Sequence, residues 1–140
     1  MATTFHQLNA GWNAEPNAPD PRIETDDGLV RLSFTLNHMI FDFEEDAVGQ
    51  IVFRGCWRYR LGPTNDEGWY RGQCRFGRIA PQWGEFYEVA GDLLEGGVSD
   101  WCVLGARSDQ SRHFLFYMRD STFECDAKDW TLILPDRRQP

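Results

Sequence analysis

The stretch that most constrains the fold is residues 51–78, where apolar and polar side chains alternate in two runs separated by a turn-rich loop. The apolar positions of the first run are Ile51, Phe53, Trp57, Tyr59 and Leu61. A period of two is what a half-buried strand requires, and residues 62–68 are of types that tolerate turn dihedrals. The sequence therefore predicts a β-hairpin with one apolar face and one basic face.

The register that keeps both arms of this hairpin in phase places Tyr59 opposite Gly72 and Arg60 opposite Arg71. Like charges directly opposite each other across a ladder are unfavourable, so the arginines need compensation. Solvent, acidic side chains of a neighbouring strand such as Glu88, and an anionic ligand are three sources of it. Internal ion pairing is the plainest of the three, because the rest of the chain is strongly acidic.

Short apolar runs recur along the rest of the chain, at 30–36, 39–43, 83–89, 101–104, 113–119, 122–127 and 130–134. No helical period is sustained over these runs. We therefore expect an all-β, single-domain antiparallel meander of about eight short strands over residues 1–140, closing as a sandwich or a barrel without a long helix. Residues 1–21, which contain three prolines, are expected to form an irregular N-terminal segment, and residues 136–140 a tail.

Aromatic residues make up 14% of the chain, enough to supply a sizeable core. We expect Trp12 to close one end of that core. The aromatic residues expected to share it occupy the same phase of three alternating runs: Phe34, Phe53, Trp57, Tyr59 and Phe76. A bulge near Asn37 is expected to interrupt the strand that begins at residue 30.

The net charge of −8 argues against nucleic acid as a partner, because affinity for phosphate backbones comes from clustered lysine and arginine. The charge is unevenly distributed. Residues 51–78 hold six arginines and two acids, and are the basic island of the chain. An acidic surface of this kind favours a basic protein as partner.

Motifs that would indicate catalysis are absent from the sequence: it has no Gly-x-Ser-x-Gly elbow, no phosphate-binding Gly-rich loop and no His-Glu-x-x-His. We therefore expect a protein that is not an enzyme and that has no cofactor and no metal site. His38 is expected to be a polar side chain at a strand kink, hydrogen-bonded to a backbone group, rather than a catalytic base. The acidic run 44–46 is expected to be a solvated loop tip.

The four cysteines, Cys56, Cys74, Cys102 and Cys125, follow no metal-ligand or compact disulfide spacing. Each lies in an apolar run, which predicts buried, reduced thiols. No stretch of 18 apolar residues and no signal-peptide pattern is present, so we expect a cytoplasmic location and no membrane partner.

Two functions are consistent with these features. The first is a non-catalytic protein-binding module for a basic partner, such as an inhibitor or immunity-type protein. The alternative is a small-ligand-binding barrel or sandwich with an arginine-lined site for a small anionic ligand. The candidate binding residues are Arg54, Arg58, Arg60, Arg71, Arg75, Asp66, Glu67 and Trp69. Trp69 is either an exposed contact for the partner or a cover over a neighbouring arginine.

Overall fold

The computed structural model describes residues 2–62, 76–77, 79–94 and 100–138, which form ten strands and no helix. The strands are β1 (Thr4–Gln7), β2 (Arg22–Asp26), β3 (Leu29–Thr35), β4 (Val48–Arg54), β5 (Arg58–Gly62), β6 (Phe86–Ala90), β7 (Cys102–Val103), β8 (Arg112–Tyr117), β9 (Thr122–Ala127) and β10 (Asp129–Ile133). The described part of the chain thus contains no helix long and apolar enough to cross a membrane.

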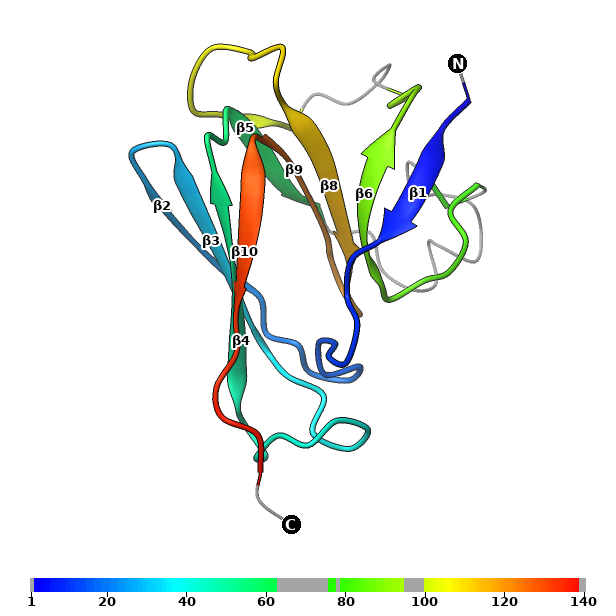
Figure 1. Ribbon diagram of the computed structural model, residues 1–140, viewed down its shortest axis with the longest axis vertical. Helices are drawn as coiled ribbons and strands as arrows, with labels where there is room; N and C mark the ends of the chain where they lie inside the picture. Colours follow the sequence, from blue (N-terminus) through cyan, green and yellow to red (C-terminus); the bar gives the residue numbers. More distant parts are fainter. Residues whose placement is uncertain (1, 63–75, 78, 95–99, 139–140) are drawn as a thin grey trace.

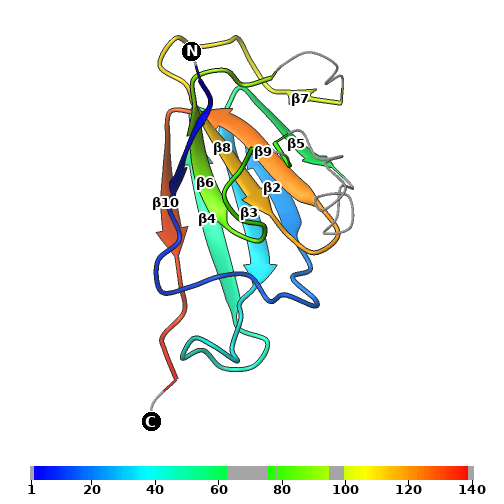
Figure 2. The ribbon, with the colours of Figure 1, turned by 90° about the vertical axis from the view of Figure 1, so that its right-hand side faces the viewer.

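The strands form two antiparallel sheets that pack face to face, as the edge-on view in Figure 1 shows. One sheet has the order β1-β6-β8-β9-β5-β7 and the other has the order β10-β4-β3-β2. Figure 2 looks onto the six-stranded sheet, where β6, β8 and β9 run side by side. The all-β prediction is confirmed, and the arrangement is sandwich-like rather than a closed barrel.

The prediction of an antiparallel meander over the whole chain is wrong. Consecutive strands are neighbours only in β2-β3-β4 and in the β8-β9 hairpin, whereas β10 pairs with β4 and β5 pairs with β9. The chain crosses between the sheets after β1, after β4 and again after β9. Each crossing brings together strands that are far apart in the sequence.

The main core lies between the two sheets and is largely aromatic. Phe53 of β4 stacks on Phe123 of β9, with their ring centroids 5.4 Å apart. Trp12 is only 3% exposed and packs against Phe34 and Phe116, so it belongs to this core. In β3, the alternation of buried and half-buried residues follows the period of two read from the sequence.

A second apolar cluster covers the other face of the six-stranded sheet. Tyr87 of β6 and Leu115 and Tyr117 of β8 contribute to it, because they alternate with residues of the main core. Phe76 belongs to this second cluster and Trp57 to neither, so a single core shared by the five predicted aromatics is wrong. Strands β8 and β9 are buried on both faces, so alternation in the sequence does not show which of the two clusters a residue joins.

The first arm of the predicted hairpin is two strands in different sheets. The break falls at Gly55, whose φ of +63° lies in the left-handed region, and a Cβ there would approach the Lys128 side chain to 2.8 Å. The chain then enters the six-stranded sheet as β5, where Tyr59 pairs with Cys102 on one side and with Cys125 on the other. Both ladder positions of Tyr59 are therefore occupied by described strands, and Gly72, its predicted partner, lies outside the described residues.

The N-terminal segment is more regular than predicted, because β1 forms the edge of the six-stranded sheet by pairing with β6. The strand expected over 39–43 does not form. β3 ends at Thr35, and the Asn37 side-chain oxygen accepts hydrogen bonds from the backbone N–H groups of Met39 and Ile40 at 3.1 and 3.3 Å. An asparagine turn replaces the predicted bulge.

Candidate functional site

The structure divides the predicted arginine face between the two sheets. Arg54 lies on β4 and forms an exposed ion pair with Asp129 at 3.3 Å. Arg58 and Arg60 lie on β5 in the other sheet. The other five candidates, Asp66, Glu67, Trp69, Arg71 and Arg75, lie outside the described residues.

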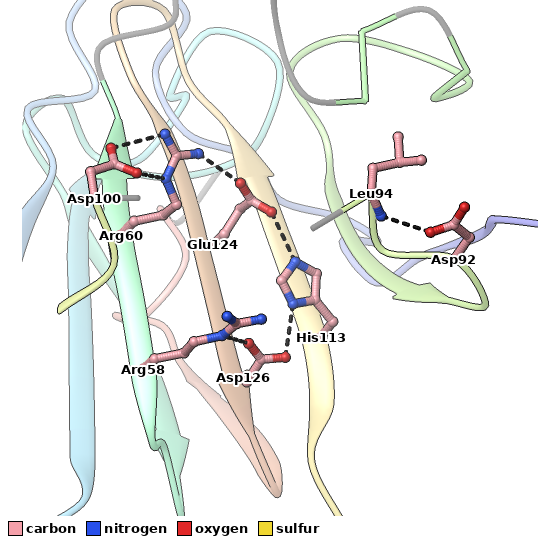
Figure 3. Close-up of polar contacts among 8 residues, drawn as sticks. All are labelled: Arg58, Arg60, Asp92, Leu94, Asp100, His113, Glu124 and Asp126. Atoms are coloured by element: carbon pink, nitrogen blue, oxygen red, sulfur yellow. Dashed lines mark hydrogen bonds and ion pairs between the residues drawn. The ribbon is translucent and has the colours of Figure 1, made fainter. Parts of the chain in front are cut away.

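Arg58 and Arg60 belong to a buried charge cluster on the outer face of the six-stranded sheet (Figure 3). The register places Arg58 opposite Asp126 and Arg60 opposite Glu124, so each guanidinium faces a carboxylate across the ladder. Arg58 Nε donates to Asp126 Oδ2 at 2.5 Å, and Arg60 Nη1 donates to Glu124 Oε2 at 2.8 Å. Internal ion pairing is therefore the compensation that these arginines have.

His113 of β8 joins the two ion pairs. Its Nδ1 lies 2.9 Å from Asp126 Oδ1, and its Nε2 lies 2.8 Å from Glu124 Oε1. The pairing of β8 with β9 places His113 opposite Asp126, so the cluster runs across three adjacent strands. At the edge, Asp100 accepts two more hydrogen bonds from Arg60, at 2.8 and 3.0 Å.

Two carboxylates on one imidazole favour its charged form. Burial alone would lower the pKa of His113, but the hydrogen bonds and negative charges of Asp126 and Glu124 raise it above its ordinary value. Burial would likewise raise the pKa of Asp126, but His113 and Arg58 lower it. A protonated His113 donates to both carboxylates, and its charge, with those of Arg58 and Arg60, balances the three acids of the cluster.

Aromatic rings cover the cluster from the outer side. The Arg58 guanidinium carbon lies 4.0 Å from the ring centroid of Trp101 and 4.5 Å from that of Trp57. The ring of Phe76 lies 6.2 Å from that of His113. Charges shielded in this way are stabilised by one another rather than by water.

The chemistry open to this cluster is limited by its own hydrogen bonds. Both nitrogens of His113 are bonded to carboxylates, so neither is available to take a proton from a substrate. In the described part of the chain, no three His, Cys, Asp or Glu side chains are placed to hold a metal ion. The cluster therefore links strands β5, β8 and β9 through ion pairs and hydrogen bonds.

Sequence reasoning missed His113, Glu124, Asp126 and Asp100. A signal for two of them was present, because Glu124 and Asp126 share one phase of a run whose other phase is apolar. Two acids on one face of a buried strand require partners of opposite charge. The sequence does not indicate which strand supplies those partners.

The acidic residues gather at a different place, in a groove of about 730 Å³ at the end of the sandwich where β3 ends and the β8-β9 turn lies, low in Figure 1. Its carboxylates come from three separate loops: Glu15, Asp20, Glu45, Asp46 and Asp120. The acidic run 44–46 is exposed as predicted, but two of its members line this groove.

The carboxylates of the groove differ in how far they are already neutralised. Asp20 pairs with Arg22 at 3.0 Å, and Asp120 lies 4.0 Å from Arg119. Within the described residues, Glu45 and Asp46 have no ion pair. The groove thus presents negative charge that the rest of the described chain does not neutralise.

His38 also lines this groove, and its Nδ1 is a buried atom without a hydrogen-bond partner in the described structure. The prediction that a backbone group satisfies His38 is wrong at this nitrogen. In the neutral ring that nitrogen can be an acceptor. Because Nδ1 is buried, it is not an acceptor on the open surface of the groove.

Three cysteines are described, and all are free. Cys56 and Cys125 are buried in the main core, where burial raises the pKa of Cys125 well above its ordinary value. Cys102 is exposed because it lies on the short edge strand β7, so its predicted burial is wrong. Cys74 lies outside the described residues.

No protein-family model, curated protein or solved structure matches this chain.

Proposed function

We propose that this chain is a non-catalytic protein-binding module that engages a basic partner through the acidic groove, as an inhibitor or immunity-type protein would. The observation that carries the proposal is the gathering of five carboxylates from three loops in one hollow. Loops at one end of a sandwich are a common place for binding residues, because the sheets hold them in position.

The electrostatics of the groove support this assignment. Glu45 and Asp46 have no ion pair within the described residues, and the chain carries a net charge of −8. Such a surface attracts a cationic partner during diffusion and raises the association rate. An arginine or lysine side chain entering the groove would find carboxylates from three loops together.

The second candidate function is a small-ligand protein with an arginine-lined anion site. Arg54, Arg58 and Arg60 each already pair with a carboxylate, so an anion at these residues would have to compete with Asp129, Asp126 or Glu124. That competition makes the basic partner the better assignment. Free cysteines persist in a reducing compartment, so the proposed place of action is the cytoplasm.

The experiment is a fluorescence-anisotropy titration of a labelled oligo-arginine peptide with two matched triple variants. The groove variant is Glu45→Gln, Asp46→Asn, Asp120→Asn. The control variant is Glu24→Gln, Asp26→Asn, Asp27→Asn. It removes the same number of exposed negative charges, but from β2 and the turn that follows it, at the other end of the sheets. Each set includes one aspartate with positive φ, Asp46 or Asp27, whose conformation asparagine tolerates.

We expect the groove variant to bind the peptide roughly tenfold more weakly, since each exposed ion pair contributes about 0.2–1 kcal/mol. The control variant should lose far less, because charges beyond about 8 Å are screened at physiological ionic strength. Equal losses in both variants would mean that net charge alone attracts the peptide, and the groove would then be rejected as the site.

A further inference from the structure

A second hollow, of about 370 Å³, lies at the opposite end of β8 from the acidic groove. It is lined by the start of β8, the end of β6 and residues of the 107–111 loop, near the top of Figure 1. Asp126 and His113 of the buried charge cluster form part of its wall. The acidic groove takes no part in this hollow.

Two of the residues that line this hollow, Trp57 and Ser111, each carry a buried hydrogen-bonding atom without a partner in the described structure, namely Nε1 and Oγ. The indole N–H can only donate, and the serine hydroxyl can donate as well as accept. Buried polar atoms without a partner are rare in folded proteins, and an unseen ligand or water is the usual explanation. A group that satisfies both atoms must therefore offer acceptors.

The charges of the wall indicate which acceptor fits. Arg112 donates two hydrogen bonds to Glu88, at 2.9 and 2.7 Å, and Arg58 is bonded to Asp126, so these cations are balanced. Arg107 lines the hollow, is exposed and has no ion pair within the described residues.

Asp109, also exposed at the rim, partly opposes the charge of Arg107. A planar guanidinium beside two hydrogen-bond donors matches an oxyanion.

We propose that this hollow binds a small oxyanion, a carboxylate or a phosphate, whose oxygens accept hydrogen bonds from Trp57 Nε1 and Ser111 Oγ and face the Arg107 guanidinium. A cation would leave the indole N–H without a partner, because that group cannot accept a hydrogen bond. This site is independent of the acidic groove and of any protein partner bound there.

The test is a titration followed by the indole N–H signals in a ¹H–¹⁵N NMR spectrum. The chain has six tryptophans, and the signal lost in Trp57→Phe identifies that of Trp57. Sodium phosphate and sodium acetate are the two probes, and sodium chloride at matched ionic strength is the control. We expect a saturable shift of the Trp57 signal with at least one probe, and the probe that saturates first distinguishes a phosphate from a carboxylate site.

Arg107→Gln should weaken that binding at least about tenfold, because a charge-assisted hydrogen bond is lost. Asp109→Asn should tighten it by removing an opposing charge. Arg138→Gln, an exposed arginine near the C-terminus, is the matched control and should change nothing. The proposal is overturned if neither probe gives a saturable shift, which would leave water alone as the partner, or if Arg107→Gln binds as tightly as the wild type.

Discussion

Removing the charge of Glu124 should destabilise the protein more than any other single change to its ion pairs. Glu124 is fully buried and accepts hydrogen bonds at 2.8 Å from both Arg60 and His113. Glu124→Gln keeps the size of the side chain but replaces one acceptor oxygen with an NH₂ group that faces a donor. Breaking a buried ion pair by removing one partner costs about 3–5 kcal/mol, a large share of a total stability of about 5–15 kcal/mol.

Urea denaturation at pH 7 measures this effect. With a slope of about 1–3 kcal/mol per molar urea, the midpoint should fall by at least about 1 M. Asp129→Asn is the matched control, because it removes the exposed partner of Arg54, and both side chains of that pair are about half exposed. The control should cost less than about 1 kcal/mol. Equal stability of the two variants would mean that the buried cluster does not hold strands β5, β8 and β9 together.

Three further predictions concern titration, thiols and packing. The raised pKa of His113 gives stability that is fully present below its unfolded pKa of about 6.5 and is lost as the pH rises through its folded pKa. The difference in unfolding free energy between wild type and His113→Gln should therefore shrink between pH 6 and pH 9. A constant difference would contradict a charged His113. In a Cys74→Ser background, a thiol reagent should modify Cys102 rapidly and Cys56 and Cys125 only on unfolding; rapid reaction of all three would contradict their burial. Phe53→Ala should lower the free energy of unfolding by about 3–5 kcal/mol in urea denaturation, because it leaves a cavity against Phe123. Ile133→Ala, at a residue that is 51% exposed, should lower it only slightly. Similar losses in the two variants would contradict the placement of Phe53 in the core.

The candidate sites were only partly predictable. The sequence singled out Arg58 and Arg60, because arginines in one phase of a strand need compensation, and it favoured internal ion pairs as that compensation. It did not predict that His113 lies between their carboxylates, since residue 113 is 55 and 53 positions away from these two arginines along the chain. The acidic groove was missed for the same reason, because its carboxylates come from three loops that only the packed sheets bring together.

The sequence by itself determined the secondary-structure class. A run such as Val30, Leu32 and Phe34 alternates with polar residues, and alternation favours a strand because successive side chains point to opposite faces. Tertiary structure alone decided which strands became neighbours. Alternation continues across Gly55, yet the chain leaves one sheet there and enters the other, because a glycine with positive φ allows the turn and β9 supplies the acids that Arg58 and Arg60 require. A period of two shows which residues of a strand share a face, but it does not show which strand lies beside it. In this protein the neighbouring strand supplies the carboxylates that balance the arginines.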